Sequence, residues 1–185
     1  MTARTLTCVF VLTAAMLGLT NAAAEAASTQ PTIFSVSCSS EIGTLQQPTA
    51  SGYRIVLGRI SVPPSYNPQV VPLPGHWPYW RKAGVAVRAG NASVTVSVPS
   101  GWRSRAAITW GNSLAVEALR FSGCEPRSGP IEHSPSGVYA SHAWNAYAGG
   151  FYLRASSACI PLIFTSDDRR ATSYFGIGRH CPKSP

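Results

Sequence analysis

The sequence predicts an all-β fold, a single antiparallel β-sandwich of immunoglobulin-like or jelly-roll type that is stapled by two disulfides. Three observations lead to this prediction. Apolar and polar residues alternate with period two in segment after segment, as half-buried strands do. Glycine, proline and asparagine punctuate these segments at the short intervals typical of sandwiches and barrels. Four cysteines remain after an N-terminal export segment, an even number suited to disulfide formation.

Residues 1–26 have the features of a cleaved secretory signal peptide. A basic start at Arg4 precedes an apolar run over residues 6–19 and an alanine-rich exit. The apolar run is shorter than the ~20 residues of a membrane-spanning helix, and no basic stop-transfer flank follows it. We therefore expect an exported protein without membrane insertion, secreted or associated with the cell surface, whose residues 27–185 form one domain.

The clearest strand covers residues 92–98, where alanine and valines alternate with serine and threonine between bounding Asn91 and Pro99. Similar patterns predict further strands at residues 34–38, 53–57, 84–88, 106–110, 118–121, 137–144, 150–154, 160–165 and 171–177. Residues 114–120 allow a second interpretation, a short helix, because good helix formers follow a potential cap at Ser113.

The last two predicted strands form a hairpin around the turn at residues 166–169, with Pro161 confined to an edge or a strand start because proline donates no ladder hydrogen bond. Two long connections are expected. One covers residues 61–81 and carries six prolines, and the other covers residues 123–136. Long loops on a rigid scaffold are where binding and catalytic residues concentrate.

Four cysteines allow three connectivities, and the sequence alone does not choose among them. Cys159 and Cys181 sit at the outer ends of the terminal hairpin, which favours a bridge between them and leaves Cys38 to pair with Cys124. No Cys-x-x-Cys or His-x-x-x-His spacing occurs, so we expect neither a metal site nor any other cofactor.

The chain carries a formal net charge of +8, and nearly all its cations are arginine. An exported protein with this excess is attracted to anionic polymers such as cell-envelope polysaccharide. The basic residues are scattered rather than clustered, so the sequence indicates no specific nucleic-acid surface. It does not predict an oligomeric state.

Catalytic signatures are weak, and we expect a binding protein rather than an enzyme. Carboxylates are few, Asp167 and Asp168 fit a hairpin turn, and no Gly-x-Ser-x-Gly elbow is present. One alternative is a secreted hydrolase that uses the loop at residues 125–133, which holds Glu125, Glu132 and His133. Another is a secreted inhibitor or effector that binds a second protein.

An aromatic cluster followed by cations is the strongest binding signal in the sequence. Flat rings beside cationic donors suit stacking on sugars or contact with an anionic polymer. The alternative is that the indoles only cap an open end of the core. The candidate ligand-binding residues are Trp77, Tyr79, Trp80, Arg81 and Lys82.

Three C-terminal segments, AYAGGFYLR at 146–154, ACIPL at 158–162 and FGIGRHC at 175–181, carry a resemblance. In these segments the chain resembles a small family of uncharacterised secreted actinobacterial proteins. The resemblance implies export and a Cys159–Cys181 bridge, and it assigns no catalytic residue. The glycines of these segments permit bends or close backbone approach within strands.

Overall fold

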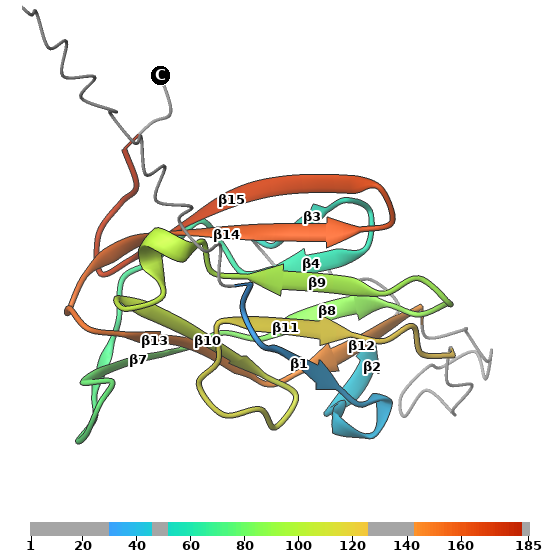
Figure 1. Ribbon diagram of the computed structural model, residues 1–185, viewed down its shortest axis with the longest axis horizontal. Coiled ribbons are helices and arrows are strands. Elements are labelled where there is room, and N and C mark those ends of the chain that lie inside the picture. Colours follow the sequence, from blue (N-terminus) through green and yellow to red (C-terminus); the bar gives the residue numbers. More distant parts are fainter. Residues whose placement is uncertain (1–29, 46–51, 126–142, 183–185) are drawn as a thin grey trace, which may run out of the picture.

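The computed structural model describes residues 30–45, 52–125 and 143–182, and over these ranges the chain is built of short strands (Figure 1). The helical segments in the described ranges are two turns of 3₁₀ helix, η1 (Cys38–Ser40) and η2 (Ser100–Trp102). The predicted all-β class is therefore confirmed. The signal peptide predicted at 1–26 and most of the strand predicted at 137–144 lie outside the described residues.

One layer of the fold is a six-stranded sheet with the order β1-β11-β9-β14-β15-β5. Its strands are β1 (Ile33–Val36), β11 (Ala118–Phe121), β9 (Val94–Ser97), β14 (Ala158–Ser166), β15 (Arg169–Ile177) and β5 (Tyr66–Asn67). The ladders are antiparallel within the sheet and parallel at its two ends, where β1 joins β11 and β5 joins β15.

The predicted terminal hairpin is confirmed as β14–β15, which pairs nine residues of each strand. Pro161 lies inside β14 opposite Tyr174. The other side of β14 pairs with β9 only at residues 163–165, so the proline occupies a stretch where one side of the strand has no ladder. This placement agrees with the expectation of a local edge.

The second layer consists of two sheets, and the chain passes from one sheet to the other without a long connection. The five-stranded sheet contains β2 (Gly43–Leu45), β12 (Trp144–Tyr147), β8 (Val85–Arg88), β4 (Ile60–Val62) and β3 (Arg54–Val56). The four-stranded sheet contains β10 (Ala106–Trp110), β13 (Gly149–Leu153), β7 (Tyr79–Lys82) and β6 (Val71–Pro72). The chain runs directly from β7 into β8 and from β12 into β13, and the Ala83 amide donates to the Gly149 carbonyl at the junction, at 2.8 Å.

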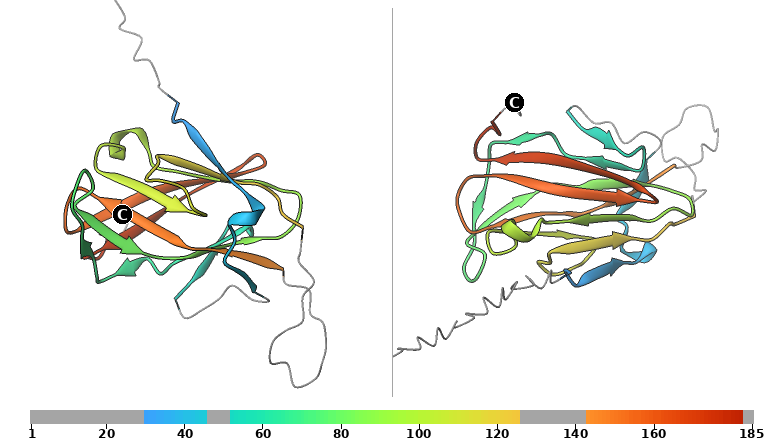
Figure 2. Two further views of the ribbon diagram at one scale, coloured as in Figure 1. Left: turned by 90° about the horizontal axis from the view of Figure 1, so that it is seen from below. Right: turned by 45° about the horizontal axis from the view of Figure 1, so that its top comes forward.

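Side chains from both layers form one core, and Figure 2 shows the strands that carry them from two further sides. The alternation predicted for β9 is observed, because Val94 and Val96 are fully buried while Thr95 and Ser97 face outward. Phe151 of the four-stranded sheet lies near Phe175 of the six-stranded sheet, with ring centroids 5.4 Å apart. Burial of such rings, together with the aliphatic side chains of the core, stabilises the packing of the two layers.

One alternative interpretation and one sequence-based expectation are wrong. The helix considered as the alternative at residues 114–120 is absent, since Val116 bridges Ile108, and the strand predicted at 118–121 is confirmed as β11, which pairs with β1 on one side and β9 on the other. The period-two burial of Leu119 and Phe121 in the core overrides helix propensity. The connection at 61–81 is not one long loop, since it contains β5, β6 and most of β7; β5 and β6 are each two residues long.

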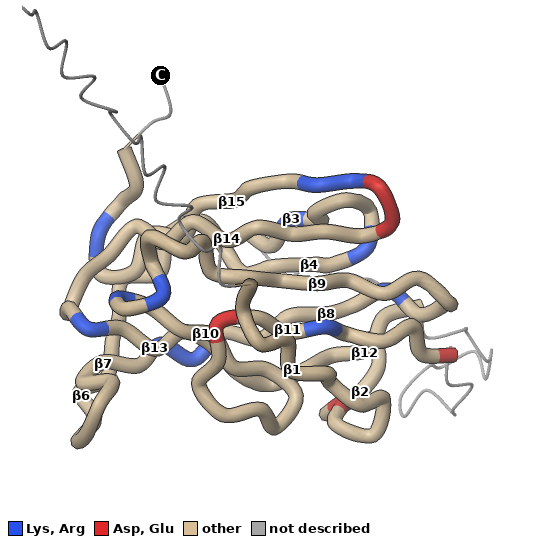
Figure 3. The backbone as a smooth tube through the Cα atoms, viewed as in Figure 1, with Lys and Arg blue, Asp and Glu red and all other residues tan. Residues whose placement is uncertain are grey.

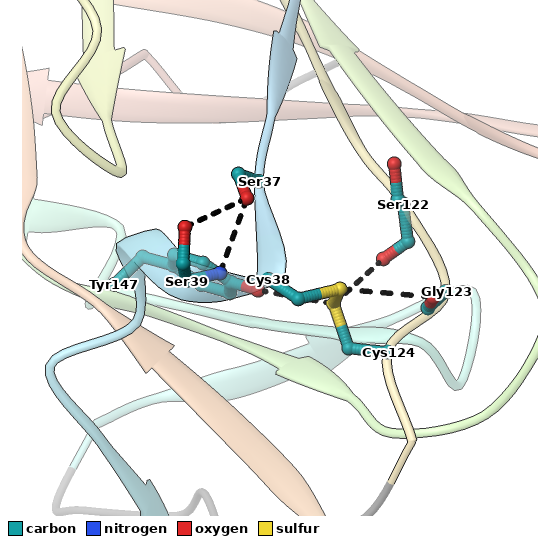
Figure 4. Close-up of a disulfide and its surroundings, with 7 residues drawn as sticks. All are labelled: Ser37, Cys38, Ser39, Ser122, Gly123, Cys124 and Tyr147. Atoms are coloured by element: carbon teal, nitrogen blue, oxygen red, sulfur yellow. Dashed lines mark hydrogen bonds between the residues drawn. A yellow bond between two sulfur atoms is a disulfide. The ribbon is translucent and has the colours of Figure 1, made fainter.

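Both predicted disulfides are confirmed, Cys38–Cys124 and Cys159–Cys181. The first joins the chain just beyond β1 to the chain just beyond β11, so it closes the parallel pair at the edge of the sheet (Figure 4). Its Cys124 sulfur lies 3.7 Å from the Tyr147 hydroxyl of the opposite layer. Two structural disulfides fit an oxidising compartment.

Removal of either disulfide is expected to lower the free energy of unfolding, and removal of the bridge that closes the longer loop is expected to lower it more. The bridges span 86 and 22 residues, so their loss is expected to cost ~5 and ~3 kcal/mol respectively in the chain-entropy model. Urea unfolding of the double variants Cys38→Ala/Cys124→Ala and Cys159→Ala/Cys181→Ala measures both values. A smaller loss for the longer loop would contradict the expectation.

A methyl group at Gly150 is expected to destabilise the four-stranded sheet. An added Cβ there would overlap the Arg81 carbonyl oxygen of β7 and lie 2.9 Å from the Trp80 indole. Gly150→Ala should lower the free energy of unfolding by ~1–3 kcal/mol, as overpacking does. Gly101→Ala is the control, because nothing lies within 4 Å of its added Cβ, and it should change stability by less than ~0.5 kcal/mol.

Candidate binding surface

The five candidate residues of the 77–82 segment do not share one face, because residues 79–82 form β7 and its side chains alternate. Tyr79 and Arg81 pair with Leu153 and Phe151, whose side chains fill the core, so these two point inward. Tyr79 packs against the core. The Nε of Arg81 is buried and has no hydrogen-bond partner among the described residues. Trp80 and Lys82 face outward.

Trp80 is the centre of a row of apolar side chains across the outer face of the four-stranded sheet. The register places Val71 of β6, Trp80 of β7 and Tyr152 of β13 side by side. The rings of Trp80 and Tyr152 are 4.7 Å apart at a tilt of 40°. Val71 is 54% exposed and both rings are half-buried. We call these three residues the aromatic row.

Arg154 joins the aromatic row to the end of the sandwich. It follows Tyr152 by two residues, just beyond the end of β13. Its Nη2 lies 2.8 Å from Nε2 and 3.0 Å from Nδ1 of His76, and its guanidinium carbon lies 5.3 Å from the centre of the Trp77 ring. His76 and Trp77 meet edge to face. Trp77 therefore supports Arg154 rather than continuing the row.

A small cavity of about 290 Å³ opens beside Arg154, and we call it the arginine pocket. Its lining comprises Trp102, Arg105, Arg154, Ala155, Ser157, Ala158 and Arg179. The Arg105 guanidinium lies over the Trp102 ring at 4.0 Å and donates from Nη2 to the Gly101 carbonyl at 2.8 Å. The Arg154 amide donates to the Arg105 carbonyl at 3.0 Å, which fixes the spacing of these two arginines.

Arg179 reaches the pocket from the segment that follows β15. The Cys159–Cys181 bridge ties this segment back to β14. The Gly178 amide donates to the Asn67 carbonyl at 2.8 Å, and Gly178 has φ of +67°, which a residue with a side chain adopts only with strain. Tyr66 of β5 stacks on His180 at 3.7 Å. These contacts on both sides of Arg179 fix its backbone beside the pocket.

The arginine pocket has no acidic lining residue. Figure 3 shows Lys and Arg positions at the left-hand end of the tube and also toward its right-hand end, so the basic residues are spread over the described chain. Glu117 pairs with Arg103 at 3.2 Å, and neither residue lines the pocket. Three guanidinium groups without a local carboxylate give this end a positive potential that favours anionic ligands.

A larger open groove of about 850 Å³ crosses the outer face of the six-stranded sheet. Its floor contains Thr95, Ser97 and Thr165, and it has no aromatic lining residue. Of its two arginines, Arg103 is already paired with Glu117. The groove therefore lacks the combination of rings and unpaired cations that the arginine pocket and the aromatic row provide.

The candidate catalytic loop and possible metal ligands were the other functional features that the sequence raised. The loop considered for a hydrolase lies outside the described residues except for Glu125, which is exposed. Within ranges 30–45, 52–125 and 143–182, no group of three or more His, Cys, Asp or Glu residues could hold a metal ion. Across the same ranges, no helix has the length and apolar character that crossing a membrane requires.

Comparison with known proteins gives no match to any family model, curated protein or solved structure. The resemblance of the C-terminal segments to secreted actinobacterial proteins thus stays a prediction. The site residues that sequence reasoning missed are Tyr152, Arg105, Arg154 and Arg179. The alternation of Phe151, Tyr152 and Leu153 is a signal in the sequence that indicates an outward-facing Tyr152. No pattern in the sequence brings the three arginines together.

The contact between Trp80 and Tyr152 is expected to stabilise the fold by ~0.5–1.5 kcal/mol beyond the area that each ring buries. A double-mutant cycle with Trp80→Ala and Tyr152→Ala measures this coupling by urea unfolding. The control cycle pairs Trp80→Ala with Tyr174→Ala, since Tyr174 is exposed on β15 of the other layer. Coupling in the control cycle, or its absence between Trp80 and Tyr152, would contradict the observed stacking.

Proposed function

We propose that this chain is a secreted, non-enzymatic binding protein that acts at or near the cell envelope on an anionic polysaccharide or a related anionic polymer. One observation carries the proposal. Arg154, which lines the arginine pocket, follows Tyr152 of the aromatic row by two residues, so the chain places the pocket directly beyond the end of the strand that carries the row. No lining residue of the pocket is acidic.

The two features suit different parts of the same polymer. The half-buried rings of Trp80 and Tyr152, on the outer face of their sheet, provide flat apolar surfaces on which the faces of sugar rings pack. Guanidinium groups donate forked hydrogen bonds to anionic oxygens with a geometry that a lysine ammonium lacks. A polymer that lies along the four-stranded sheet toward Arg154 would contact the rings first and the pocket at its end.

Location at the envelope rests on the signal-like N-terminus and the two disulfides. Disulfides persist in oxidising compartments outside the cytosol. The net charge of +8 draws the protein toward anionic polymers over the range of the Debye length, about 8 Å at physiological salt. Charge alone gives affinity without selectivity, so the rings are the source of selectivity in this proposal.

The test is co-sedimentation of the oxidised mature protein with insoluble wall polysaccharide and peptidoglycan at low and high salt. The binding variant is Trp80→Ala/Tyr152→Ala, and the matched control is Tyr174→Ala, which removes an exposed ring from the opposite layer. We expect the wild type and the control to stay bound at high salt, and the binding variant to lose at least about tenfold in affinity, since truncation of Trp or Tyr at a binding hot spot costs ~2 kcal/mol or more.

Two outcomes would overturn the proposal. If high salt releases all three proteins equally, the attraction is charge alone and no specific surface exists. If none of the proteins sediments with any polymer at low salt, the ligand class is wrong and a protein partner or a catalytic role becomes the better hypothesis. Far-ultraviolet circular dichroism and thermal unfolding of each variant establish that lost binding is not lost folding.

A further inference from the structure

We infer that the arginine pocket is a subsite for a tetrahedral oxyanion, a phosphate or sulfate ester group carried by the polymer. This inference rests on the proposed function and adds the chemical group that the polymer must bear. A planar carboxylate, as in a uronic acid, is the competing ligand chemistry.

The lining of the pocket supplies cationic donors from three separate segments. Arg105 follows η2, Arg154 follows β13 and Arg179 follows β15. Each guanidinium has five N–H donors and no acceptor. Arg105 uses one donor on the Gly101 carbonyl and Arg154 lies against His76 through Nη2, which leaves other donors of both groups available. Arg179 is exposed and pairs with none of the described carboxylates.

The number and spread of these donors favour a tetrahedral group over a planar one. A carboxylate has two oxygens in one plane, so a single guanidinium fork already matches it. A phosphate ester presents up to three acceptor oxygens pointing in different directions and carries as much as about two negative charges. Cations that approach from three segments can each meet a separate oxygen of such a group.

Contacts with neighbouring rings orient two of the three arginines before any ligand binds. Arg105 lies over Trp102 and Arg154 lies near Trp77. Such contacts restrict side chains that otherwise lose rotamer entropy on binding. The cavity of about 290 Å³ accommodates one ester group with part of its sugar or polyol, rather than several repeat units.

The test measures binding of three small probes to the oxidised mature protein by isothermal titration calorimetry at matched ionic strength. The probes are glycerol 3-phosphate, glucose 6-sulfate and glucuronate. We expect at least one of the two esters to bind about tenfold or more tightly than glucuronate, because a tetrahedral group presents oxygens to more of the three guanidinium groups than a planar carboxylate does. Comparison of the two esters identifies which oxyanion the pocket takes.

Arg179→Gln is the informative variant, since no hydrogen bond, ion pair or ring contact of the described structure involves its side chain. It should weaken binding of the preferred ester about tenfold or more, with thermal unfolding unchanged. Arg120→Gln is the control, because it removes the same charge from an exposed position on β11 outside the pocket. Its ester affinity should stay within about twofold of the wild type.

The two levels of proposal fail separately. Equal or tighter binding of glucuronate, or an equal loss of ester binding in both arginine variants, overturns the oxyanion subsite. If the wild type then still sediments with wall polymer at high salt, the proposed function stands with a different anionic group. If neither ester binds and no polymer is retained, both the subsite and the proposed function are wrong.

Discussion

The position of β13 between β10 and β7 is the constraint on which the rest of the structure depends. Two consecutive glycines, Gly149 and Gly150, allow β13 to lie this close to both neighbours. A side chain on either glycine would overlap a carbonyl oxygen of the neighbouring strand. Phe151 and Leu153 then enter the core. The same alternation directs Tyr152 outward and brings Arg154 to the end of the sandwich. Core packing and the candidate binding surface thus have one origin.

The disulfides hold the parts of the fold that strand pairing holds least. Cys38–Cys124 closes a parallel pair of four-residue strands at one end of the six-stranded sheet. Cys159–Cys181 holds the chain that follows β15. β15 ends at Ile177, and the strand that pairs with its outer side there, β5, is only two residues long. Because Arg179 lies inside this second loop, the bridge that stabilises the terminus also positions one wall of the arginine pocket.

The cations of the described chain are spread over the fold, and the sites differ in whether a carboxylate accompanies them. A carboxylate beside each arginine would neutralise the surface, as Glu117 does for Arg103. At the arginine pocket the neighbours are aromatic rings and small residues instead, which orient the guanidinium groups without cancelling their charge. A proposed role in binding anionic polymers follows from this arrangement more than from the net charge of the chain.

The sequence by itself determined the all-β class, most strand positions, the terminal hairpin and the preferred cysteine pairs, because alternation and turn residues are local signals that strands express directly. The sequence indicated Trp80 as a binding residue, but it assigned all five candidate residues at 77–82 to one binding surface. That interpretation assumed a loop, whereas the side chains of β7 alternate between the two faces of the sheet. Only the tertiary structure excluded the helix considered at residues 114–120 and placed Arg105, Arg154 and Arg179 around one cavity. Both depend on contacts between segments far apart in the chain, and no local pattern of residues records which distant strand a segment will pair with.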